Sequence, residues 1–128
     1  MRTSPALRTL IVANLIASAL HFGDNMLRFS EYPEPTWISS PHVVDALWLA
    51  ITPLLGVGWW LAKREMKWAA IAGLWVYGIL SMFVLGHYFY AAPARLSFRI
   101  NVLIGAEAAA AALLMVSAPL LIPRREQR

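Results

Sequence analysis

Four long apolar runs constrain the fold of this chain more than any other feature. They cover residues 7–26, 43–62, 68–90 and 100–122, and only a few polar side chains interrupt each of them. About 20 consecutive apolar residues are enough for a helix to cross a bilayer. Because four such helices and their connections use nearly all of the 128 residues, the sequence predicts one all-α domain, residues 1–128. We expect it to fold as an integral membrane four-helix bundle.

The connections are polar or rich in proline. Residues 23–42 contain Pro33, Pro35 and Pro41, which predict a stiff loop that is not helical throughout. Residues 63–67 predict a tight turn, and Pro93 interrupts the helical pattern before the last run. Each connection is therefore short or stiff, as expected for neighbouring helices of one bundle.

The first run also resembles a secretory signal peptide. Arg2 and Arg8 accompany a brief apolar stretch, and Ala17-Ser18-Ala19 has the form of a cleavage site. Asn14 is unusual in the apolar core of a signal peptide. We therefore interpret this segment as a retained transmembrane helix.

The basic residues are distributed unequally between the two ends of the predicted bundle. Eight of the eleven lie at the end that holds both termini and the second connection: Arg2, Arg8, Lys63, Arg64, Lys67, Arg124, Arg125 and Arg128. The opposite end has only Arg28, Arg95 and Arg99. Because cytoplasmic loops carry an excess of Lys and Arg, we expect both termini in the cytoplasm. The predicted location is a bacterial inner membrane, or the ER membrane if the source is eukaryotic.

Composition restricts the chemistry that this chain can perform. It has no cysteine, so disulfides and thiolate sites are excluded, and only 14% of its residues are charged. Its basic residues flank apolar runs and do not form a patch interleaved with aromatics, so nucleic acid is not an expected partner. The expected partners are the lipid bilayer and a hydrophobic small molecule, with a homodimer left open. We predict no cofactor.

Polar side chains of all four helices are expected to meet near the outer end of the bundle. Groups of this kind are costly in lipid and usually face a bundle interior. The candidate site residues are His21, Asp24, Asn25, Asp45, Trp48, His87, Asn101 and Glu107. Asn14, Ser18, His21 and Asn25 are spaced by four, three and four residues, which places them on one face of the first helix. Glu107 lies about 12 Å beyond Arg99 along the last helix, too deep for an interfacial residue.

Most of these residues also have a purely structural interpretation. His21 and Asp24 could form a polar cap at a helix end, Asp45 suits a helix start, and His87 lies among interfacial tyrosines. Asn101 could cap the last helix. Glu107 is the hardest to explain without a function, because an unpaired carboxylate within a span is costly.

The polar pattern resembles that of the EXPERA superfamily, which includes emopamil-binding sterol isomerase and the sigma-type receptors. The likeness rests on His21-Phe22-Gly23-Asp24, the Pro-rich loop with Trp37, Asp45, and the segment Trp48 to Pro53, and it extends to Val76-Tyr77-Gly78 and Asn101. The resemblance implies a membrane bundle around a cavity for a sterol-like or cationic amphiphilic ligand, with acid-base isomerase activity in some members.

By this analogy, His21, Asp24 and Asp45 would be the catalytic acid-base groups. Trp48 and Asn101 would line the pocket, and Asn25, His87 and Glu107 are added here as ligand-binding residues. The chain departs from the isomerase pattern, because aspartates stand in place of glutamates and it has four predicted spans where the isomerase has five.

Two other classes of function remain open. His21 and His87 with nearby carboxylates are suitable ligand types for a metal or haem, although no HxxxH or HExxH spacing is present. Alternatively, the polar residues specify only helix packing, as in an accessory membrane subunit without chemistry of its own.

Overall fold

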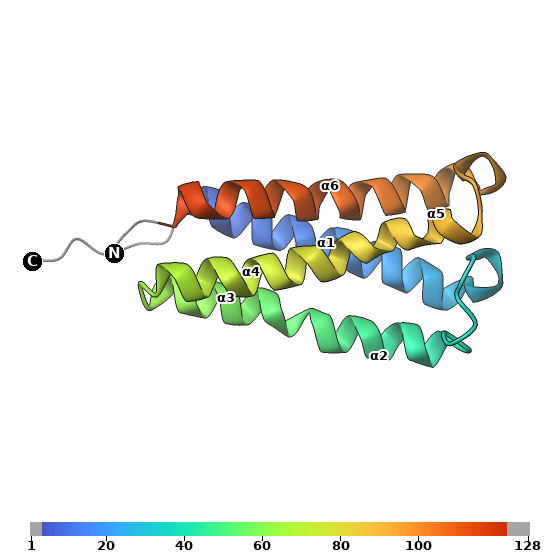
Figure 1. The fold of residues 1–128 in the computed structure, drawn as a ribbon, viewed down its shortest axis with the longest axis horizontal. Coiled ribbons are helices and arrows are strands. Elements are labelled where there is room, and N and C mark those ends of the chain that lie inside the picture. The colour runs from blue at the N-terminus through green and yellow to red at the C-terminus, as the bar shows by residue number, and fades with distance from the viewer. Residues whose placement is uncertain (1–3, 123–128) are drawn as a thin grey trace, which may run out of the picture.

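The computed structural model describes residues 4–122 as a bundle of four helical spans (Figure 1). The elements, in chain order, are α1 (Pro5–Leu27), η1 (Phe29–Glu31), α2 (Pro41–Ile51), α3 (Pro53–Lys63), α4 (Lys67–Met82), η2 (Phe83–Gly86), α5 (His87–Tyr90), η3 (Pro93–Arg95) and α6 (Phe98–Leu121). Helices α2 and α3 together form the second span, and α4, η2 and α5 form the third. No strand occurs within residues 4–122.

Each of the four spans is long and apolar enough to cross a membrane. The predicted all-α four-helix fold is therefore confirmed, and the chain has the character of an integral membrane protein. The predicted boundaries differ from those of the observed spans by at most two residues. Arg2, Arg124, Arg125 and Arg128, which contribute to the predicted orientation, lie outside the described residues.

The two ends of the bundle differ in the kinds of side chain that they bury. We call the end where α1 begins, α6 ends and α3 turns into α4 the terminal end. The end with the loops 28–40 and 91–97 is called the polar end. The core of the terminal half is formed by apolar side chains, among them Leu7, Leu74 and Leu114. The buried Asn, Ser, His and Glu side chains of the described residues lie from the middle of the bundle toward the polar end.

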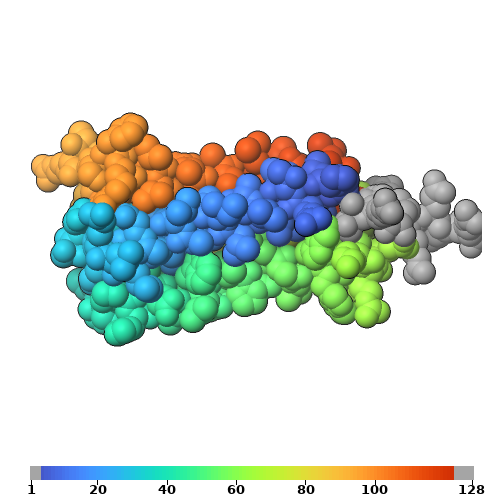
Figure 2. All heavy atoms as spheres, turned by 180° about the vertical axis from the view of Figure 1, so that it is seen from behind, coloured from blue at the N-terminus to red at the C-terminus, as the bar shows by residue number. Residues whose placement is uncertain are grey.

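Helices α1 and α6 pack along a seam with the spacing of a coiled coil. The buried residues of α1 are Leu7, Asn14, Ser18, His21 and Asn25, and those of α6 include Ile100, Ile104, Glu107, Ala111, Leu114 and Ala118. Steps of three and four keep one face of a helix toward its partner. The predicted polar face of α1 is therefore confirmed, and it faces the protein interior. Figure 2 shows α1 lying between α6 on one side and α2 and α3 on the other.

The second span is bent, contrary to the continuous helix expected over residues 43–62. It divides into α2 and α3 around Thr52, directly before Pro53. Proline lacks an N–H group and disrupts the helix at the preceding turn. Helix α3 packs along α4, whereas α2 leans away from it toward the polar end (Figure 1).

Close packing of α3 on α4 gives a first testable prediction. A Cβ added at Gly58 would lie 2.5 Å from Cδ2 of the fully buried Leu74, whereas one at Gly56 meets nothing within 4 Å. We expect Gly58→Ala to lower the free energy of unfolding by about 1–3 kcal/mol through overpacking. Gly56→Ala should stabilise the helix slightly. Thermal unfolding of both variants in detergent tests this, and equal stabilities would contradict the packing described.

Candidate functional site

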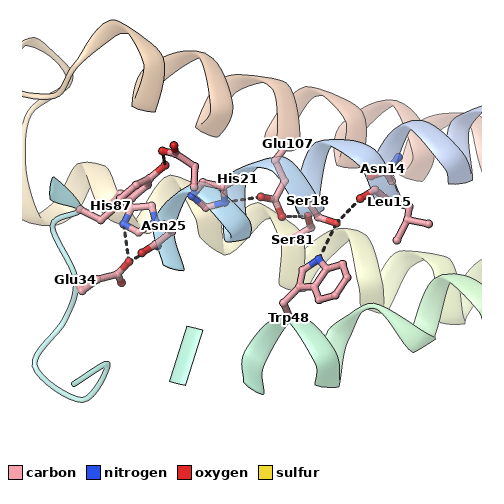
Figure 3. Close-up of polar contacts among 12 residues, drawn as sticks. Asn14, Leu15, Ser18, His21, Asn25, Glu34, Trp48, Ser81, His87 and Glu107 are labelled. Carbon is pink, nitrogen blue, oxygen red and sulfur yellow. Dashed lines mark hydrogen bonds and ion pairs between the residues drawn. The ribbon is translucent and has the colours of Figure 1, made fainter. Parts of the chain in front are cut away.

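A buried pair of ionisable side chains joins α1 to α6 (Figure 3). Nδ1 of His21 lies 2.6 Å from Oε2 of Glu107, and the hydroxyl of Ser81 on α4 donates to Oε1 of Glu107 at 2.7 Å. His21 and Glu107 are almost completely buried. Both carboxylate oxygens therefore have partners, which offsets the cost of placing Glu107 within a span.

Two other residues on the polar face of α1, Asn14 and Ser18, also form hydrogen bonds to other spans. The amide of Asn14 donates to the carbonyl of Ala110 on α6 at 2.9 Å, and the hydroxyl of Ser18 accepts from the indole N–H of Trp48 at 3.2 Å. The hydroxyl of Tyr77 on α4 donates to the carbonyl of Asn14 at 3.4 Å. These bonds connect α1 to each of the other three spans.

Glu34 attaches the Pro-rich loop to the bundle. Its carboxylate accepts a hydrogen bond from the amide of Asn25 on α1, and its Oε1 lies 3.8 Å from Nδ1 of His87 on α5. The same nitrogen of His87 is 3.4 Å from the carbonyl of Pro33. The Glu34 side chain is itself buried, although it belongs to a loop.

A charged network covers the polar end above these residues. Arg99 contacts Asp24 at 3.3 Å and Glu31 at 2.6 Å, and Arg28 contacts Asp24 at 3.3 Å. The hydroxyl of Tyr32 donates to Oδ2 of Asp24 at 2.8 Å. Burial raises the pKa of Tyr32 well above its ordinary value, and the hydrogen bond to the Asp24 carboxylate adds to this shift.

The raised pKa of Tyr32 predicts a loss of stability at alkaline pH. Because Tyr32 holds its proton more tightly in the folded protein, its contribution is complete below about pH 10 and declines as the pH rises above that value. The decline should approach about 1.4 kcal/mol per pH unit. Tyr32→Phe should remove this component, so the pH dependence of thermal unfolding should be flatter in the variant. Parallel curves for parent and variant above about pH 10 would contradict the prediction.

A cavity of about 590 Å³ lies between α1, α2 and the third span. Its polar lining residues are His21, Asn25, Glu34, Ser81 and His87, together with the hydroxyl-bearing Tyr90. The other lining residues are apolar or aromatic and include Val44, Leu47, Ile51, Leu80, Val84 and Trp37. The rings of His21, His87 and Tyr32 lie within 5.4–5.6 Å of one another, centroid to centroid, so the two histidines are packed together with Tyr32 at this end.

The structure brings four of the eight candidate residues to one place. His21, Asn25 and His87 line the cavity, and Glu107 lies directly behind its wall through its bonds to His21 and Ser81. Asp24 belongs to the charged network at the polar end and does not line the cavity.

Three other candidates are not among the residues that line the cavity, which corrects the expectation of one shared site. Val44, Leu47 and Ile51 form the cavity face of α2, and Asp45 lies about 100° or more around the helix from each of them. Trp48 points toward α1, where it donates to Ser18. Asn101 lies inside α6, donates to the carbonyls of Pro93 and Ser97 and accepts from Tyr88. The capping interpretation is wrong, because the cap of α6 is Ser97, whose hydroxyl accepts from the N–H of Ile100.

Sequence reasoning missed Glu34, Tyr32 and Ser81. The segment Tyr32-Pro33-Glu34-Pro35 carries a signal that could have been used, since a carboxylate between two prolines has a restricted backbone and can be positioned by it. Ser81 is a single hydroxyl within an apolar run and gives no such signal. Ser81 bonds to Glu107 only because α4 packs against α6, and the sequence does not show which helices are neighbours.

The donor set for a metal is incomplete in the part of the chain that the structure describes. Among residues 4–122, no group of three His, Asp or Glu side chains is arranged to hold a metal ion. His21 and His87 each face a carboxylate instead. The metal-site alternative therefore has no geometric support from these residues. Comparisons of the chain with protein-family models, curated proteins and solved structures find no match.

Proposed function

We propose that this protein binds a hydrophobic small molecule, sterol-like or cationic and amphiphilic, in the cavity between α1, α2 and the third span. The observation that supports this proposal is the cavity itself, whose volume of about 590 Å³ lies within the range of known ligand pockets. A mostly apolar lining with a few polar groups is typical of such pockets. The resemblance of the sequence motifs to those of the EXPERA superfamily supports the same class of ligand.

Exposed aromatic side chains among the lining residues suggest how a ligand enters. Trp37, Phe83, Phe89 and Tyr90 line the cavity and are also largely exposed at the surface of the bundle. Phe83 and Phe89 belong to the third span, and Trp37 belongs to the loop that leads into α2. Aromatic residues favour the membrane interface. We infer that the ligand enters from the lipid near the polar end, between α2 and the third span.

Filling the cavity tests the proposal. Leu47 lines the cavity, whereas Leu49 on the same helix is exposed and does not line it. We expect Leu47→Trp to weaken binding of the fluorescent sterol dehydroergosterol, or of dodecylamine competing with it, by at least about tenfold. Binding is measured by energy transfer from tryptophan to dehydroergosterol in lipid nanodiscs.

Leu49→Trp is the matched control, because it introduces the same side chain on the lipid-facing side of α2. It should leave the affinity for both probes unchanged. If neither probe binds the parent protein above its partition into lipid, the ligand-binding proposal is wrong. The accessory-subunit interpretation would then take its place.

Acid-base chemistry on the ligand is a second candidate, favoured by one observation. His21 lines the cavity, its Nδ1 is held by Glu107, and its Nε2 has no hydrogen-bond partner among the described residues. A ring nitrogen oriented by a carboxylate is a common arrangement for proton transfer. His21 would donate a proton to one carbon of a sterol double bond and then take a proton from a carbon next to the resulting cation, so that the double bond moves by one position. In heavy water the donated proton is deuterium, which mass spectrometry detects in the product. Absence of deuterium in sterols that bind would exclude this candidate.

A further inference from the structure

Glu34 is a buried acid with one unpaired carboxylate oxygen. Its side chain is only 7% exposed. Oε1 accepts from the amide of Asn25 on α1 and lies 3.8 Å from Nδ1 of His87 on α5. Oε2 has no hydrogen-bond partner within residues 4–122, and it is not among the unpaired atoms there that are completely buried. Oε2 is therefore an unpaired acceptor that another molecule can still reach.

The loop holds this oxygen at the wall of the cavity. Glu34 and the next residue, Pro35, both line the cavity. Figure 3 shows one carboxylate oxygen of Glu34 directed toward Asn25 and His87 and the other directed away from them. Pro33 and Pro35 restrict the backbone on both sides of Glu34. The position of Oε2 is therefore set before a ligand binds.

The lining of the cavity determines which head group suits this oxygen. Among the described residues that line it, Glu34 is the only acid and none is lysine or arginine. The hydroxyl of Ser81 already donates to Glu107, and the amide of Asn25 already donates to Glu34. The carboxylate of Glu34 can only accept hydrogen bonds, and an acceptor left unpaired in a buried site is costly. A ligand that brings a donor would remove this cost.

The apolar part of the lining leads from Glu34 toward the middle of the bundle. Val44, Leu47 and Ile51 lie along one face of α2 and cover about 10 Å of that helix. Leu80 of the third span also lines the cavity. A molecule with its head group at Glu34 would therefore lie with its apolar part toward the membrane centre, as a lipid does.

We propose that the head group of the ligand donates an N–H or O–H hydrogen bond to Oε2 of Glu34. This inference rests on the proposed binding function and deepens it, because it assigns the polar anchor of the ligand to an acid of the Pro-rich loop. It also limits the ligand to amphiphiles with a donor in the head group. An alcohol and a protonated amine share that donor, whereas an ether and a quaternary ammonium lack it.

Two pairs of dodecyl compounds separate hydrogen-bond donation from charge. Dodecanol and dodecyl methyl ether are neutral, whereas protonated N,N-dimethyldodecylamine and dodecyltrimethylammonium are cationic, and only the first member of each pair has a donor. Each compound competes with dehydroergosterol in nanodiscs, with its affinity expressed as a mole fraction in the lipid. We expect the donor to bind about tenfold more tightly than its partner in at least one pair, as one lost hydrogen bond implies. The pair that shows the difference identifies the donor as a hydroxyl or an ammonium.

Two acids of the loop 28–40 supply matched variants. Glu31 contacts Arg28 and Arg99 in the charged network and does not line the cavity. Glu34→Leu removes the acceptor at the cavity and should reduce the preference for a donor to about onefold. Glu31→Leu should leave the preference near tenfold. Should Glu34→Leu fail to fold, the comparison of head groups on the parent protein decides alone.

The outcomes separate this inference from the function on which it depends. Equal affinities within both pairs would overturn the donor assignment while leaving a ligand pocket in place. A preference that persists in folded Glu34→Leu, or that both variants lose equally, would also overturn it. If no compound of either pair competes, the proposed function fails together with the inference.

Discussion

Glu107→Leu is expected to lower the free energy of unfolding by about 3 kcal/mol or more, since one partner of a buried pair is removed. The substitution leaves the ring of His21 and the hydroxyl of Ser81 without the carboxylate that they contact. Both groups are buried, at 2% and 4% exposed. Unfolding in detergent, followed by circular dichroism during a titration with sodium dodecyl sulfate, measures the change.

A double variant identifies the cause of that loss. When His21→Leu accompanies Glu107→Leu, neither member of this pair remains, and we expect at least half of the lost stability to return. Glu107→Gln keeps an acceptor for Ser81 and should cost less than Glu107→Leu. If Glu107→Leu is as stable as the parent, the pair between α1 and α6 does not stabilise the bundle.

The second large effect concerns the orientation in the membrane. The chain has no cysteine, so a single introduced cysteine is its only site for maleimide labelling. Ala94→Cys at the polar end should react with a membrane-impermeant maleimide in intact cells. Met66→Cys, in the turn at the terminal end, should react only after the cells are permeabilised. We expect the terminal end on the cytoplasmic side because the basic residues concentrate there. The difference in labelling between the two variants should be all-or-none, because the maleimide does not cross the membrane.

Both positions are exposed in the structure, so access to solvent is not limited by packing. The parent chain, which cannot be labelled, gives the background. If Met66→Cys is labelled in intact cells and Ala94→Cys is not, the orientation is the reverse of the one predicted. The cavity would then open toward the cytoplasmic side of the membrane.

The four spans could be predicted from the sequence because their length and hydropathy are set by the bilayer. The polar face of α1 could also be predicted, since Asn14, Ser18, His21 and Asn25 follow the helical period. That Glu107 needs a partner followed from its depth within an apolar run. Its pairing with His21 and Ser81 did not, because the period of a helix does not tell which neighbour it faces.

The parts of the site that sequence reasoning missed depend on tertiary arrangement. Glu34 reaches Asn25 and His87 only because the Pro-rich loop folds back over the polar end. The cavity lies where α2, which precedes the bend at Thr52 and Pro53, leans away from α4. A hydropathy pattern does not show the distance between two helices. Asp45 was expected at the site from its depth and from the resemblance to the EXPERA superfamily, whereas its position around the axis of α2 decides that it does not line the cavity.

The seam between α1 and α6 has a consequence for biosynthesis. Of the four described spans, α1 is translated before the others and has the lowest mean hydropathy, and the carboxylate that pairs with its histidine belongs to α6. Until α6 is translated, His21 and Asn14 have no access to the partners that they contact on that helix. Trp48 of the second span can reach Ser18 earlier. The packing described here is therefore complete only after α6 is translated, and until then α1 depends on water, lipid head groups or the insertion machinery to accommodate its polar face.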